Sequence, residues 1–81
     1  MKLECVELLT QAGREIEFIY KRKRYSITYY YENEKKNISF CEFYCEPIDV
    51  ESVRELLKIK IKNRTLEEIL SNLKDTAIDI Y

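Results

Sequence analysis

The spacing of hydrophobic residues changes along the chain, and each change predicts a different kind of element. Near the start, Cys5, Leu8, Leu9 and Ala12 recur at the spacing of one helix face. Gly13 follows, and glycine is favoured just after a helix because it adopts the left-handed conformation without strain. The pattern predicts a helix over residues 2–12 with this apolar face buried.

Three later segments alternate apolar and polar residues with period two, which is typical of β-strands. They are residues 15–20, 25–31 and 38–45, separated by polar stretches at 21–24 and 32–37. We therefore expect an antiparallel meander of three strands.

The register of the first hairpin follows from the requirement that the apolar faces of the two strands coincide. A four-residue loop at 21–24 would pair Tyr20 with Tyr25 and Phe18 with Ile27. Every pair on the buried face is then apolar, so the pattern favours this register.

The same requirement gives a sharp prediction for the third strand. Unbroken pairing with the second strand would put Glu42 opposite Ile27 in the core, where an unpaired carboxylate is costly. One extra residue would move Phe43 into that place instead. The sequence therefore predicts a β-bulge at residues 41–42.

The second half of the chain predicts helices and a short strand. Asp49 is a suitable N-cap for a short helix over residues 50–57. Residues 58–62 alternate like a strand and are expected to form an extended connector or a minor strand. Thr65 and Glu68 form a capping box for the next helix, and residues 77–81 form a short final strand.

The predicted fold class is α+β. It is two-layer, with an N-terminal helix, a three-stranded antiparallel meander, two short helices and a short C-terminal strand. The 81 residues have room for one core, so we expect a single compact domain over residues 1–81. Short helices cover only one face of such a sheet, and the other face is expected to meet solvent or a partner.

Composition restricts the classes of function. Charged residues make up 36% of the chain but nearly cancel at a net charge of −1, so no overall field attracts nucleic acid or an anionic membrane. Three cysteines without a secretion signal do not indicate a disulfide framework. We expect a soluble cytoplasmic protein with no membrane partner. The bias toward Lys, Ile, Glu and Asn suggests an AT-rich coding sequence, as in bacteria or mobile elements.

Several features argue against catalysis. The chain has no His, the commonest acid–base group and metal ligand, and its one Gly leaves no phosphate-binding loop. On an extended strand Cys41 and Cys45 would lie roughly 13 Å apart, too far for a shared metal or a disulfide. We expect these two and Cys5 to be small buried hydrophobic residues. The carboxylates of Glu15 and Glu17 suit solvated positions, and we expect no enzyme activity, no cofactor and no metal.

The uncovered sheet face is the first candidate site. In the predicted register Ile19, Tyr30 and Tyr44 lie on it among the carboxylates of Glu15 and Glu17. Tyrosine is favoured at protein interfaces, and the carboxylates oppose phosphate. The face therefore suits a protein partner or a second copy of the chain, although a solvated face with scattered tyrosines fits the same residues.

Two basic clusters are the second candidate site. The residues are Lys21, Arg22, Lys23 and Arg24 at the first hairpin tip, and Lys58, Lys60, Lys62 and Arg64 before the last helix. Such groups bind phosphates and would bind nucleic acid if both clusters shared one surface. Tyr20 and Tyr25 flank the first cluster but point toward the core, so they are not free to stack on bases. A charged turn that keeps a hairpin from aggregating is the alternative interpretation. We therefore expect a non-enzymatic protein-interaction module first and a nucleic-acid-binding accessory protein second.

Overall fold

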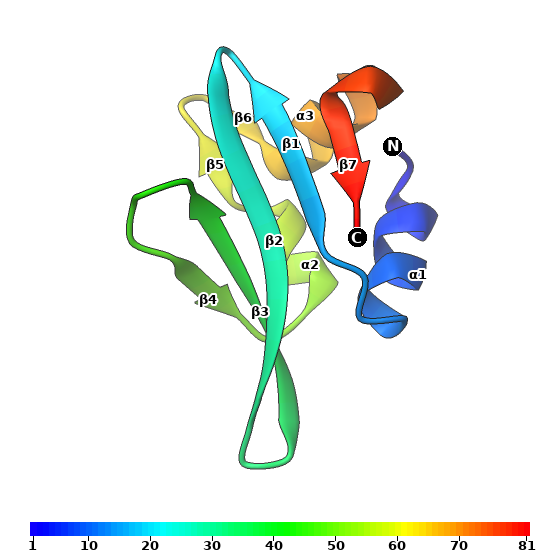
Figure 1. The fold of residues 1–81 in the computed structure, drawn as a ribbon, viewed down its shortest axis with the longest axis vertical. Helices are drawn as coiled ribbons and strands as arrows, with labels where there is room; N and C mark the ends of the chain where they lie inside the picture. Colours follow the sequence, from blue (N-terminus) through cyan, green and yellow to red (C-terminus); the bar gives the residue numbers. More distant parts are fainter.

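The computed structural model describes all residues from 1 to 81 and confirms the predicted mixed α+β class, with an N-terminal helix, an antiparallel meander, short helices and a C-terminal strand (Figure 1). In chain order the elements are α1 (Leu3–Gln11), β1 (Ile16–Tyr20), β2 (Lys23–Glu32), β3 (Lys35–Glu42), β4 (Ile48–Val50), α2 (Val53–Leu57), β5 (Lys60–Ile61), β6 (Arg64–Thr65), α3 (Leu66–Asn72), the 3₁₀-helix η1 (Asp75–Ala77) and β7 (Ile78–Ile80). None of the helices combines the length and the apolar character that crossing a membrane requires.

The main sheet has five strands in the order β4-β3-β2-β1-β7, and every neighbouring pair is antiparallel. The final strand was expected, and the structure places it beside β1. Strand β4 differs from the prediction, which makes Asp49 the N-cap of a helix. Asp49 instead pairs with Ser39 in the sheet, and Ser52 caps α2 by accepting a hydrogen bond from the Glu55 amide at 3.2 Å.

The first hairpin differs from the predicted register. Its turn contains only Lys21 and Arg22, both with positive φ, so Phe18 pairs with Tyr25 and Ile16 pairs with Ile27. A two-residue turn of this kind suits the right-handed twist of the strands. The predicted four-residue loop was wrong by a shift of two residues. Because such a shift leaves every side chain on its own face, the apolar pattern could not distinguish the two registers.

The predicted β-bulge was also wrong. Strand β3 pairs with β2 without interruption from Lys35 to Glu42, around a two-residue turn. The true register puts Phe40 opposite Ile27 and Glu42 opposite Tyr25, at the end of the sheet. The side chain of Glu42 is 31% exposed there. The carboxylate is therefore not buried in the core, and no bulge is needed to keep it out.

The core lies between one face of the sheet and the three helices. Phe18, Tyr25 and Phe40 stack in neighbouring strands, with ring centroids 5.3 to 6.3 Å apart. All three helices contribute buried side chains against these strands, namely Val6, Leu56, Leu57, Leu66, Ile69 and Leu70. In Figure 1, α2 and α3 lie behind the sheet, and no helix crosses its front. The opposite face of the sheet is therefore uncovered.

Helix α1 is rotated relative to the prediction. Val6 and Thr10 face the core, whereas Leu8 is 65% exposed. The Thr10 hydroxyl lies 3.3 Å from the Tyr29 hydroxyl, and Lys36 Nζ donates to the Thr10 carbonyl at 2.6 Å. These contacts hold the end of the helix against the β2–β3 hairpin. The apolar stripe expected to be buried is consequently largely exposed.

The end of α1 follows the prediction. Gly13 has φ of 69°, and its amide donates to the Thr10 carbonyl. The next amide, of Arg14, donates to the Leu9 carbonyl at 2.9 Å. This pair of bonds forms a Schellman motif, in which the left-handed residue is usually glycine.

The connection between α2 and α3 also follows the prediction. Residues 58–62 contain the minor strand β5, which pairs with β6. Thr65 Oγ1 then accepts from the Glu68 amide at 3.3 Å and lies 3.2 Å from the Glu68 carboxylate. Thr65 therefore caps α3 as predicted, although the Glu68 carboxylate accepts from the Thr65 hydroxyl and not from the backbone amide that completes a capping box.

Candidate interaction surfaces

The uncovered side of the sheet, which we call the open face, consists of alternate residues of the five strands. None of its side chains is buried, because the helices lie on the other side. Its members are Glu17, Ile19, Arg24, Ser26, Thr28, Tyr30, Glu32, Lys35, Asn37, Ser39, Cys41, Asp49 and Asp79.

Small side chains occupy the middle of the open face. Ser26 pairs with Cys41, and Thr28 pairs with Ser39 in the next row of the same face. Larger residues lie beyond them along β1 and β2, with Ile19 at 45% exposure toward one end. The face is therefore mostly polar, and its small central side chains let another protein approach closely there.

The open face carries four carboxylates against one guanidinium and one ammonium group. Glu17 lies directly opposite Asp79 in the β1–β7 pair, Asp49 lies on β4, and Glu32 lies at the end of β2. Like charges directly opposite each other in a sheet are destabilising. None of these four carboxylates has a cationic group within ion-pair distance, and Lys35 pairs instead with Glu51.

Tyr30 is held near Asp49 at the far end of the face. Partial desolvation, followed by the charge of Asp49 and a hydrogen bond with it, raises the pKa of Tyr30. The phenol is therefore neutral at physiological pH, while 36% of the residue stays exposed. Such a side chain offers apolar area together with a hydrogen-bonding group.

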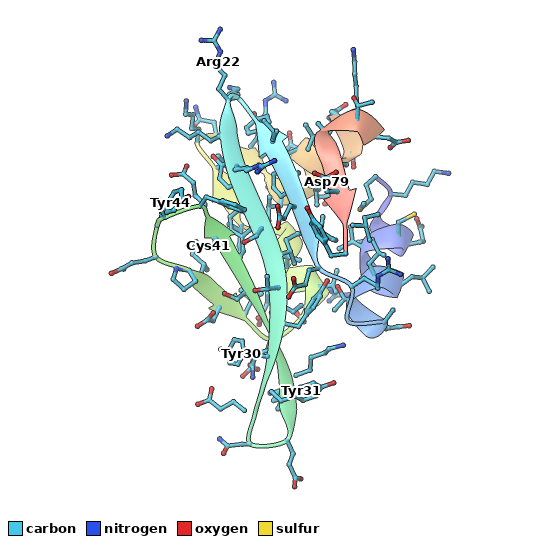
Figure 2. All side chains as sticks on the ribbon, in the orientation of Figure 1. Arg22, Tyr30, Tyr31, Cys41, Tyr44 and Asp79 are labelled. Carbon is cyan, nitrogen blue, oxygen red and sulfur yellow. The ribbon has the colours of Figure 1, made fainter.

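The structure brings together part of the predicted site. Glu17, Ile19 and Tyr30 share the open face, in rows set by the corrected register. Glu15 precedes β1, and its carbonyl accepts from the Tyr81 amide at 2.8 Å. Tyr44 lies in the turn after β3 with φ of 69° and is fully exposed. Figure 2 shows Tyr44 beside the β3–β4 edge, away from Tyr30.

The two basic clusters lie toward the same end of the long axis. Figure 1 shows the β1–β2 turn and the β5–β6 hairpin at the end opposite the β2–β3 turn, and in Figure 2 Arg22 extends beyond that end. Some of the cations are already engaged. Lys23 lies 3.7 Å from Glu42, and Arg64 lies 3.9 Å from Glu68.

Two aromatic residues that the sequence did not point to lie beside the first basic cluster, at the β1–β2 turn, which we call the basic tip. The guanidinium of Arg24 lies 5.7 Å from the ring centre of Phe43, and the Phe43 and Tyr44 rings meet edge to face. These residues, with Lys23 and Glu42, line an open hollow of about 390 Å³. The correct register would have revealed this, because the Phe43 amide donates to the Arg24 carbonyl at 2.9 Å.

The orientation of Tyr20 and Tyr25 follows the prediction. Tyr25 is buried, and Tyr20 is half-buried against the core. Neither ring is free to stack on a base. Any stacking at the basic tip therefore depends on Phe43 and Tyr44.

The cysteines are not the buried hydrophobic residues that were expected. Cys5 and Cys45 are exposed, and Cys41 is half-buried. The chain turns after β3, where the Cys45 amide donates to the Glu42 carbonyl, so the separation predicted for an extended strand does not hold. The Cys41 thiol consequently reaches the Cys45 carbonyl at 3.0 Å. No group of three or more Cys, Asp or Glu side chains is arranged to hold a metal ion.

The Cys45 thiol donates to the Glu42 carboxylate at 2.9 Å. This hydrogen bond, assisted by desolvation and the carboxylate charge, raises the pKa of Cys45. The same bond and the nearby Lys23 lower the pKa of Glu42. A catalytic cysteine needs the opposite shift, because the thiolate is the nucleophile.

Comparison with known proteins gives no match to a protein-family model, to a curated protein or to a solved structure. Function must therefore be argued from the surfaces described above.

Proposed function

We propose that this protein is a non-enzymatic interaction module that binds another protein through the open face. The observation that carries the proposal is the sheet itself, since all three helices pack on one side and leave the other side uncovered. Ile19 and Tyr30 supply partly exposed apolar area on that side. Small residues between them allow a partner's main chain or side chains to approach.

The charge of the face favours a basic partner. Glu17 and Asp79 oppose each other with no cation within ion-pair distance, and a partner's Lys or Arg would relieve that repulsion. Two copies meeting face to face would bring the acidic rows together. Self-association through this face is therefore the less favoured form of the proposal.

Two further observations fit a non-enzymatic cytoplasmic role. The three cysteines are unpaired, as is usual in a reducing compartment. The thiol with a shifted pKa, Cys45, is shifted away from the thiolate form. Both support the proposal without depending on the identity of the partner.

Adjacent tyrosines on opposite sides of β2 provide a test. A photoreactive phenylalanine analogue at Tyr30 should form a cross-link to another protein in living cells, because Tyr30 lies on the open face. The same analogue at Tyr31 is the control, since Tyr31 is more exposed but points to the other side. Equal cross-linking at both positions, or none at position 30, would contradict the proposal.

Light scattering distinguishes a partner from self-association. The proposal predicts a monomer of 9.8 kDa at micromolar concentration. A dimer that Thr28→Arg converts to a monomer would mean that the open face binds a second copy instead.

A second candidate is the binding of single-stranded nucleic acid at the basic tip. Phe43 and Tyr44 beside Arg24 favour it, because bases stack on exposed aromatic rings while cations hold phosphates. Filter binding of a labelled oligonucleotide should then fall steeply with salt and should weaken in Tyr44→Ser. No retention at low salt would remove this candidate.

A further inference from the structure

A groove separates helix α1 from the edge strand β7. It has a volume of about 330 Å³ and is lined by Met1, Cys5, Leu8, Leu9, Asp75 and Ile80. Figure 1 shows β7 at the edge of the sheet, with α1 on its outer side. The groove lies at the side of the sheet and is separate from the open face.

Most of the apolar lining comes from one face of α1, which the spacing of its hydrophobic residues predicts to be buried. Cys5, Leu8, Leu9 and Ala12 follow the spacing of one helix face. In the structure Leu9 is half-buried, and the other three residues are exposed. Leu8 is 65% exposed, and Ile80 across the groove is 44% exposed. The folded chain therefore leaves uncovered an apolar surface of the kind that usually contacts a partner.

Free main-chain groups border the same groove. The Tyr81 amide donates to the Glu15 carbonyl, so the alternation of an antiparallel pair directs the polar groups of Asp79 toward β1 and those of Ile78 and Ile80 outward. The Ile78 amide already donates a hydrogen bond to the Asp75 carbonyl. The Ile78 carbonyl and both polar groups of Ile80 remain for another strand.

The opposite edge of the sheet is less suited to strand addition. Pro47, which has no amide hydrogen, directly precedes β4, and proline is a common protection of sheet edges. The β7 edge has no proline beside it. Of the two edges, the one facing the groove is the better template.

We propose that the groove binds an extended apolar segment of a partner protein, which adds to β7 as a further strand. Alternate apolar side chains of the segment would contact Leu8 and Leu9, and its main chain would pair with Ile80. Asp75 is the only charged side chain of the lining, so a Lys or Arg of the segment belongs beside it. Because α1 flanks the edge, a single strand fits there better than the sheet of a second copy.

This inference concerns a different surface from the proposed function and holds whether or not the open face binds a protein. To test it, the full chain is immobilised and used to select binders from a random-peptide display library. We expect enriched peptides with alternating apolar residues and a basic residue near one end. Absence of enrichment, or peptides without this pattern, would overturn the inference.

Variants locate the binding site of the enriched peptides. Leu8→Lys should weaken binding roughly tenfold or more, because it puts a charge into the apolar wall. Ile48→Lys is the matched control, since Ile48 is similarly exposed at the opposite edge. Thr28→Arg on the open face should also leave peptide binding unchanged. Equal loss in Leu8→Lys and Ile48→Lys would contradict the assignment.

A modified peptide separates strand addition from general apolar adhesion. Methylation of the alternate peptide amides that face β7 should abolish binding, whereas methylation of the other amides should not. In the complex, the Ile80 amide should exchange with solvent more slowly than in the free protein. Equal binding of both methylated peptides, or unchanged exchange at Ile80, would rule out pairing with β7.

Discussion

Glu42 is the last residue of β3, lies on the core side of the sheet and has favourable partners for its charge. It pairs with Tyr25 in the ladder, accepts a hydrogen bond from the Cys45 thiol and lies 3.7 Å from Lys23 Nζ. The bulge prediction assumed that a carboxylate in this strand would be buried without a partner. The turn after β3 and Lys23 on β2 supply these partners, and neither contact can be read from the linear sequence.

The lowered pKa of Glu42 predicts a specific pH dependence of stability. The charged carboxylate stabilises the fold above its ordinary pKa of 4.5, and this contribution is lost as the pH falls through the lowered value in the folded state. The difference in free energy of unfolding between wild type and Glu42→Gln should therefore shrink below pH 4.5. Urea denaturation across the acid range measures it, and a difference independent of pH would contradict the assignment.

Two isoleucines test which face of the sheet is the core. Ile27 is completely buried, whereas Ile19 on the open face is 45% exposed. Ile27→Val should lower the free energy of unfolding by about 1 kcal/mol through lost packing. Ile19→Val should change it by less than about half that amount. Equal losses in denaturant unfolding would mean that the open face is covered in the isolated chain.

At the scale of elements, periodicity predicted most helices and strands. Helix α1, the three meander strands, helix α3 and strand β7 all fall where the apolar spacing placed them. Strand β4 was missed because three residues are too few to show a period. The hairpin registers were missed because a shift of two residues preserves both faces.

The candidate site was predictable only in part, for the same physical reason. Residues within one strand, such as Glu17 and Ile19, keep their face under a register error of two. Contacts between strands do not, so Phe43 beside Arg24 and Asp79 beside Glu17 could not be foreseen. Sequence alone also placed Tyr44 on a strand, although it lies in a turn.

The β1–β2 turn gives a prediction at this scale. Lys21 and Arg22 have φ of 49° and 68°, a conformation that glycine adopts without strain. Arg22→Gly should raise the free energy of unfolding by up to about 1 kcal/mol. Arg22→Ala is the control, because it removes the charge and keeps the strain. Thermal or urea denaturation measures the change. If Arg22→Ala raises the free energy of unfolding as much as Arg22→Gly, relief of charge repulsion explains the effect instead.

At the scale of the molecule, much of the positive charge gathers at one end, and Arg24 belongs both to that end and to the open face. Carboxylates are spread over the open face, while lysines and arginines gather at the β1–β2 turn and the β5–β6 hairpin. The net charge of −1 conceals this division. A basic protein partner at the open face and a nucleic acid at the β1–β2 turn would therefore use adjoining surfaces that share Arg24.

Quantitative capture with a blocked open face tests the proposed function most directly. Thr28→Arg puts a long side chain at the centre of the face, and Ser71→Arg puts the same side chain on an exposed position of α3. Each variant, once shown to unfold at the wild-type temperature, is used to capture proteins from its native cells. The account predicts that Thr28→Arg retains roughly one tenth or less of the partner held by wild type, and that Ser71→Arg retains it fully. Equal retention by the two variants would contradict the account.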